Sequence, residues 1–86
     1  KEYTLVKELF VPRIFSPNGD GINDIFMKGH KITIFDRTGT VIFSGDNGWD
    51  GTYKGKTVPN DIYFYILQYK DNKEKIITKN GYIGVK

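Results

Sequence analysis

The chain has 86 residues, enough for one domain with a thin hydrophobic core, and we expect a single domain over residues 1–86. It contains no cysteine, which excludes disulfides and thiolate chemistry, so six Tyr, six Phe and one Trp must supply the stabilising bulk. The formal net charge of +3 arises in residues 70–86, because residues 1–69 carry eight basic and eight acidic side chains. A nucleic-acid partner is not expected, since such proteins usually show a denser basic patch with interleaved arginines.

Residue types alternate with a period of two, which is typical of strands, and no window shows a helical stripe. The expected strands fall within residues 4–11, 31–36, 40–44, 62–70, 74–79 and 82–86. Residues 62–69 are apolar or aromatic on both sides, which favours a central strand. No apolar run is long enough to span a bilayer, and no signal peptide opens the chain, which starts like a piece of a longer protein.

Turn residues separate these stretches. "DRTGT" at 36–40 predicts a hairpin connection, with Gly39 available for a positive φ, and "DNK" at 71–73 predicts a second turn. "KNG" at 79–81 predicts a third turn between two short C-terminal strands. Six or seven short strands at this spacing indicate an all-β sandwich or barrel of antiparallel strands.

"FSPNGDGIND" at 15–24 can be interpreted as an incomplete calcium loop. Calcium prefers six to eight oxygen ligands arranged around a sharp glycine turn. The ligands would be the side chains of Asn18, Asp20 and Asp24 and the carbonyl of Ile22, but Met27 stands where a bidentate Glu is required. The alternative is a corner in which the Asn and Asp side chains cap backbone amides.

"DNGWDGTYKGK" at 46–56 also carries oxygen ligands, but it is better explained as a plug and a turn. Trp49 would close one end of the sandwich while Asp50 and Gly51 reverse the chain. Catalysis has little support, because the sole histidine, His30, lies beside lysines in "KGHK", which indicates an exposed loop residue. We expect no enzyme.

The motifs together resemble a known family. "VPRIFSPNGDGINDIF", "ITIFDRTGTVIF", "WDGTYKGKTVPNDIYFYIL" and "GYIGV" occur in the order of the gliding-motility-associated C-terminal domain, the type B sorting domain of the type IX secretion system. The resemblance covers about residues 9–85 and implies an immunoglobulin-like antiparallel β-sandwich of about seven strands. Two positions depart from the family pattern: Thr38 replaces a common Trp, and Asp61 replaces a common Gly after the "VP" pair.

The resemblance also implies a function. Members sit at the C-terminus of large secreted or surface proteins of Bacteroidota and are read by the secretion machinery, the type B class by a PorP/SprF-type outer-membrane protein. This implies export across the outer membrane to the cell surface or medium. We expect a monomer or weak dimer, since open sheet edges favour strand exchange.

Basic residues are the expected partner-binding set. They are Arg37, Lys70, Lys73, Lys75, Lys79 and Lys86. The C-terminal lysines can alternatively be solvated charges that blunt a sheet edge. Arg37 could also form an ion pair with Asp20 or Asp24, which would join two family motifs.

Two other functions fit the sequence. One is an Ig-like calcium-binding or adhesive surface module. The other is a purely structural sandwich that spaces other domains, related to the Ig-like parts of flagellar-hook-capping proteins, which share the "SPNGDG" loop.

Overall fold

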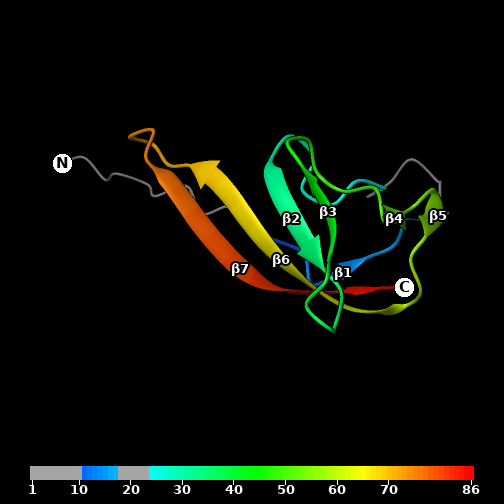
Figure 1. Ribbon diagram of the computed structural model, residues 1–86. Helices are drawn as coiled ribbons and strands as arrows, with labels where there is room; N and C mark the ends of the chain where they lie inside the picture. Colours follow the sequence, from blue (N-terminus) through cyan, green and yellow to red (C-terminus); the bar gives the residue numbers. More distant parts are fainter. Residues whose placement is uncertain (1–10, 18–23) are drawn as a thin grey trace.

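The computed structural model describes residues 11–17 and 24–86. In these ranges the chain forms strands and no helix, and so no helix able to cross a membrane (Figure 1). The strands are β1 (Ile14–Phe15), β2 (Lys31–Phe35), β3 (Val41–Gly45), β4 (Thr52–Tyr53), β5 (Lys56–Thr57), β6 (Asp61–Lys70) and β7 (Ile76–Val85). The all-β prediction is confirmed. The strand expected within residues 4–11 lies, apart from Val11, outside the described residues.

Five strands form one sheet in the order β1-β7-β6-β2-β3, and β4 and β5 form a separate small hairpin. β6 occupies the middle of the sheet, as its apolar sequence predicts, and pairs with β7 from Asp61–Val85 to Lys70–Ile76. β1 runs parallel to β7, with the N–H groups of Gly84 and Lys86 donating to the carbonyls of Arg13 and Phe15 at 2.8 and 3.1 Å. The sheet is therefore mixed, whereas the sequence predicted antiparallel strands throughout.

One face of the sheet, called here the inner face, carries the core. Ile32 and Ile34 of β2 and Leu67 of β6 are fully buried, with strand neighbours that are more exposed, as the period of two requires. The other buried hydrophobic residues are Phe15, Phe26, Trp49, Val58, Tyr63, Tyr65, Ile83 and Val85.

A second layer covers this inner face, and Trp49 is its centre. Phe26 and Trp49 form an isolated antiparallel bridge, with N–H···O distances of 2.7 and 2.9 Å. The Trp49 ring lies 5.9 Å from that of Phe15 and 5.7 Å from that of Tyr63, centroid to centroid. Its indole N–H donates to the carbonyl of Thr52 at 3.1 Å. This two-layer arrangement is consistent with a β-sandwich, and the predicted role of Trp49 as a plug is confirmed.

The turn predicted at "KNG" is wrong, because β7 continues through residues 79–81. Gly81 lies opposite Tyr65 in the β6–β7 register. A Cβ atom at Gly81 would stand 2.7 Å from the Tyr65 hydroxyl oxygen. The glycine thus makes room for an aromatic side chain on the neighbouring strand, and the two short strands expected at the C-terminus are one long strand.

Replacing Trp49 with Ala should destabilise the domain by about 3–5 kcal/mol, the usual cost of removing a buried aromatic side chain. A domain of this length is stable by only about 4–13 kcal/mol, so the denaturation midpoint should fall steeply. Tyr53→Ala, at an aromatic ring that is 39% exposed, is the matched control. A wild-type midpoint for Trp49→Ala would show that the second layer does not depend on this ring.

Candidate functional site

The β2–β3 turn, with the family motif "FDRTG", is organised around the Asp36 carboxylate. One oxygen, Oδ1, accepts the N–H groups of Thr38 and Thr40 at 2.9 and 3.0 Å and the Thr38 hydroxyl at 2.6 Å. Gly39 has φ +89°, as predicted for this connection, and its N–H donates to the Asp36 carbonyl at 3.0 Å. Thr38, which replaces the family's Trp, thus ties the turn together from within.

These hydrogen bonds lower the pKa of Asp36 below its usual 3.8, the Thr38 hydroxyl contributing most. A carboxyl whose pKa is lower in the folded chain stabilises the fold above pH 3.8, and this stabilisation is lost as the pH falls through the folded-state pKa. Asp36→Ala should therefore lower the melting temperature at pH 7, with a difference from wild type that shrinks as the pH falls below 3.8.

Thermal melts from pH 7 to pH 2 measure this dependence. Asp46→Ala, at an exposed aspartate elsewhere on the surface, is the control and should leave the melting temperature close to that of wild type across the range. A constant difference between wild type and Asp36→Ala across the range would contradict a carboxylate role in the turn.

Arg37 projects from the same turn and is 72% exposed. Its Nη1 lies 3.7 Å from Oδ2 of Asp61, so its ion-pair partner in the structure is the first residue of β6. The partner expected from the sequence was Asp20, which lies outside the described residues, or Asp24. The difference arises because Phe35 pairs with Phe64, which brings the turn alongside the start of β6. An exposed pair of this kind adds at most about 1 kcal/mol to stability.

Asp61 replaces the glycine that the family commonly has, and the structure shows why this is tolerated. Asp61 has no positive φ, so a left-handed residue is not required here. Its Oδ1 accepts the N–H of Ile62 at 2.7 Å. Two residues later the Tyr63 hydroxyl donates to the Pro59 carbonyl at 2.8 Å. Burial, and then the Asp61 charge, raises the pKa of Tyr63 above its ordinary 10.0, so this hydroxyl, a donor at neutral pH, stays protonated to a higher pH.

The "WDG" motif builds a turn of the same design as the β2–β3 turn. Asp50 Oδ1 accepts the N–H and the hydroxyl of Thr52 at 3.1 and 2.7 Å. Gly51 has φ +82°, and a Cβ atom there would stand 2.6 Å from Cγ of Pro17. The predicted turn at Asp50 and Gly51 is confirmed.

His30 is less exposed than the sequence predicted. His30 is half-buried and tied into the turn before β2, with Nδ1 3.1 Å from the Lys28 carbonyl. The backbone carbonyl of His30 also accepts the N–H of Gly48 at 3.0 Å. It holds two segments together instead of standing free in a loop.

The predicted calcium ligands are mostly beyond the described residues. Asn18, Asp20 and Ile22 lie outside them, whereas Asp24 opens the second described range. In that described part of the chain, no group of three His, Asp or Glu side chains could hold a metal ion. The calcium hypothesis stays a prediction.

The calcium hypothesis predicts that about 1 mM calcium, the range of weak extracellular sites, raises the melting temperature. An ion that binds only the native chain must stabilise it. Asp24→Asn should abolish the increase, and Asp46→Asn should leave it unchanged. Equal melting temperatures with calcium and with chelator would support a capped corner instead.

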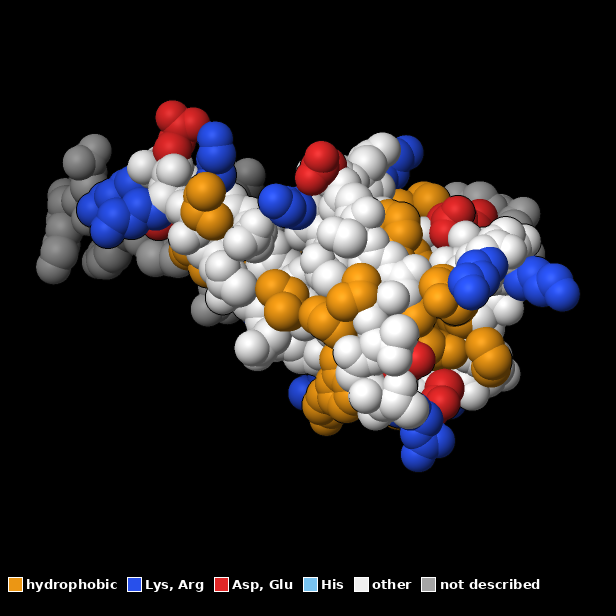
Figure 2. All heavy atoms as spheres, in the orientation of Figure 1, with side chains coloured by type: hydrophobic (Ala, Val, Ile, Leu, Met, Phe, Trp, Pro, Cys, Tyr) orange, Lys and Arg blue, Asp and Glu red, His pale blue; other side chains and the backbone are white. Residues whose placement is uncertain are grey.

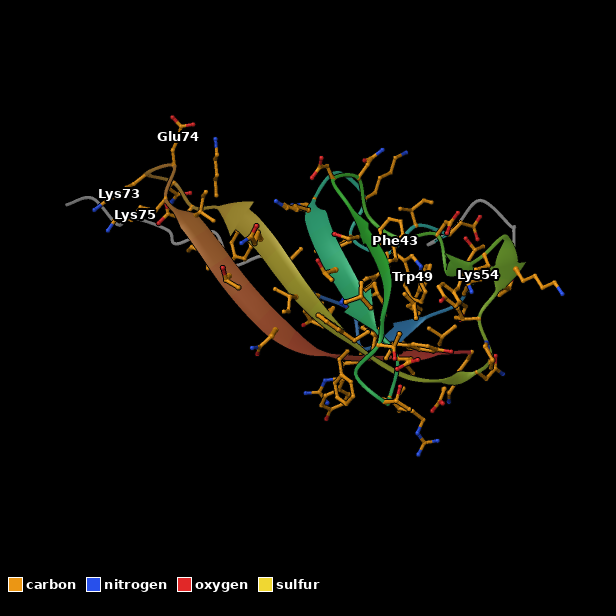
Figure 3. All side chains as sticks on the ribbon, viewed as in Figure 1. Phe43, Trp49, Lys54, Lys73, Glu74 and Lys75 are labelled. Atoms are coloured by element: carbon orange, nitrogen blue, oxygen red, sulfur yellow. The ribbon has the colours of Figure 1, made fainter. Side chains whose placement is uncertain are left out.

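The predicted partner-binding residues do not form one patch. Lys70 ends β6, and Lys73 and Lys75 lie in the loop that follows, so these three gather at the tip of the β6–β7 hairpin. Figure 2 shows basic and acidic side chains together at this tip, and Figure 3 labels Lys73 and Lys75 beside Glu74, far from Trp49. The remaining residues, Arg37, Lys79 and Lys86, are distributed along the sheet.

Asp71 shapes the hairpin tip, which confirms the predicted turn at "DNK". Its Oδ1 accepts the N–H groups of Lys73 and Lys75 at 2.8 and 2.9 Å. Glu74 has φ +59°, and its N–H donates to the Asp71 carbonyl at 3.0 Å. The tip therefore presents its lysines from a defined loop.

Sequence reasoning missed one surface, the outer face of the sheet. Ile62, Phe64 and Ile66 alternate with the buried residues of β6 and are 45%, 43% and 38% exposed. Tyr82 on β7, the register partner of Phe64, is 64% exposed. The signal was the alternation itself, which separated these residues from Tyr63, Tyr65 and Leu67. The second apolar side was taken to be buried.

These observations define a small all-β module whose described motif residues build turns and core. The sequence profile of the CHU_C type IX secretion signal domain matches residues 9–85. The chain therefore belongs to this family, as its motifs predicted. No curated protein matches the chain significantly. Family membership implies a sorting-signal role in type IX secretion and export across the outer membrane.

Proposed function

We propose that this chain is a non-catalytic sorting module that an outer-membrane component of the type IX secretion system recognises through protein–protein contacts. The component would be of the PorP/SprF type, and the module would take a larger cargo protein to the cell surface or the medium. The observation that carries this proposal is the family match over residues 9–85, nearly the whole chain.

The engagement of the turn carboxylates supports a binding role over a catalytic one. Asp36, Asp50 and Asp71 each accept a backbone N–H two residues further on, at 2.8–3.1 Å. A general acid or base needs a proton-exchanging group that faces a substrate cleft. These side chains are instead committed to the geometry of their turns.

The lysines at the hairpin tip are suited to steering. Lys70, Lys73 and Lys75 are exposed on a long hairpin, where charges speed the encounter with an acidic partner. Arg37, Lys79 and Lys86 would add weaker contacts elsewhere. Charge at an exposed rim changes the association rate more than the affinity.

The structure also decides how the C-terminal strand is best tested. Removing residues 81–86 would delete half of β7, including the buried Ile83 and Val85. Such a truncated chain would lose core packing, so its failure to be secreted would say nothing about recognition. Substitution of exposed side chains is the cleaner experiment.

The test is a secreted reporter fused ahead of the 86-residue chain, in a bacterium that has a type IX system. The wild-type fusion should appear in the medium or on the surface. Lys73→Glu with Lys75→Glu should slow export several-fold, with the effect largest at low salt, because the reversal opposes encounter with an acidic surface.

Lys54→Glu with Lys56→Glu, which makes the same charge change at exposed positions near the β4–β5 hairpin, is the matched control. It should export like wild type. Retention of the wild-type fusion inside cells with an intact secretion system would refute the sorting role. Equal export of the two charge-reversed variants would refute the role of the hairpin lysines and leave the sorting role standing.

A further inference from the structure

The outer face of the five-stranded sheet carries a continuous apolar row. Val41 pairs with Phe35, Phe35 with Phe64, and Phe64 with Tyr82, which gives four register partners on β3, β2, β6 and β7. Cross-strand partners lie side by side on one face. The β2–β3 register shifts between Ile34 and Phe35, and beyond this shift Thr33 and Ser44 share a face, with their hydroxyl oxygens 3.3 Å apart.

This row is exposed to an unusual degree. Val41, Phe64 and Tyr82 are 52%, 43% and 64% exposed, and Phe35 is half-buried. The Phe64 and Tyr82 rings together present roughly 200 Å² of surface. Isolated exposed apolar residues are normal, but a contiguous group marks an interaction site.

Further apolar residues widen the row along the strands. Ile62 and Ile66 flank Phe64 on β6, and Ile14 lies beside Gly84, the register partner of Ile62. Ile14 is 55% exposed. Between Phe64 and Tyr82 the surface is hollowed by about 340 Å³, with Phe35 and Ile66 also on the walls. Figure 2 shows hydrophobic side chains grouped at the lower margin of the view, beneath β6 and β7.

The charges on this face indicate what would cover it. By alternation, the ionisable strand residues on the outer face of β2 and β6 are Lys31 and Lys70, both exposed. No Asp or Glu of the five sheet strands belongs to this face. Lys31 lies two residues, about 7 Å, beyond the Thr33–Ile66 pair. The face is therefore an apolar strip with Lys31 and Lys70 at one end, and the exposed Arg13 lines a hollow beside Tyr82.

A second copy of the chain would bring to this face the same lysines and, from the outer side of its sheet strands, no carboxylate to pair with them. The complementary occupant is a different protein whose surface carries an apolar strip bordered by carboxylates. We infer that the outer-membrane partner of the sorting module docks on this face. Phe64 and Tyr82 would be the central anchors, and Lys31 and Lys70 would face the carboxylates that border the partner's apolar strip. This inference rests on the proposed function and names the surface that carries it out.

The experiment pairs the purified PorP/SprF-type protein of the host, in detergent, with the 86-residue chain fused to its reporter. Phe64→Thr with Tyr82→Thr should weaken binding about thirtyfold or more, as loss of interface anchors does, and export should fall with it. Thr favours strands, so the sheet should persist, which the melting temperature checks. Tyr53→Thr, at an exposed aromatic residue of β4, should bind and export like wild type.

A second pair of substitutions keeps the test decisive if the Thr variant unfolds. Lys31→Glu with Lys70→Glu alters only exposed side chains and should weaken binding about tenfold through repulsion at the acidic border. Lys54→Glu with Lys56→Glu should not. If the Thr variant folds and its binding is unchanged, the docking face is overturned. If the Thr variant is unfolded, unchanged binding of the Lys31 and Lys70 variant overturns it.

Three outcomes separate this inference from its alternatives. A wild-type fusion that neither binds nor is exported would overturn the proposed function and the docking face together. Wild-type export that the Thr variant retains would overturn the face alone. Two further results would also overturn the inference, provided that the Thr variant still binds the outer-membrane protein. If the Thr variant loses binding to vesicles of phosphatidylethanolamine and phosphatidylglycerol, the face binds lipid. If it loses a dimer that sedimentation detects in the wild type, the face binds a second copy of the chain.

Discussion

The backbone bridge between Phe26 and Trp49 is the contact on which the two-layer architecture depends. Two reciprocal hydrogen bonds, of 2.7 and 2.9 Å, join the segment before β2 to the segment before β4. They hold the Trp49 ring against Phe15 and Tyr63, and so place the second layer over the sheet. A chain of 86 residues without cysteine has few other ways to fasten segments so far apart in sequence.

Two of the family motifs, "FDRTG" and "WDG", and the β6–β7 hairpin tip share one turn geometry. Asp36, Asp50 and Asp71 each bind the N–H two residues ahead, and the first two also bind the hydroxyl of that residue. Asp fits this role because its short carboxylate reaches its own downstream backbone. The "FDRTG" and "WDG" motifs therefore mark where the chain turns.

The sequence predicted the strands better than it predicted what covers them. Alternation identified β2 and β6 and the faces of each, because burial on one side leaves a period of two. It misread Gly81 as a turn, since a glycine that admits Tyr65 from the next strand looks the same in sequence as one with a positive φ. The partner of Arg37 was equally hidden, because strand register decides it.

The same limit explains the outer face. An apolar side chain in a strand predicts a buried surface. The sequence does not distinguish burial by another part of the same domain from burial by a binding partner. In the structure the Trp49 layer covers the inner face, and Phe64 and Tyr82 are left exposed on the other. An exposed apolar sheet face risks self-association unless charges oppose it. Lys31 and Lys70 are placed to do so, because the outer faces of two copies carry like charges and no carboxylate from the sheet strands. The arrangement keeps the face open for a partner that supplies the missing carboxylates.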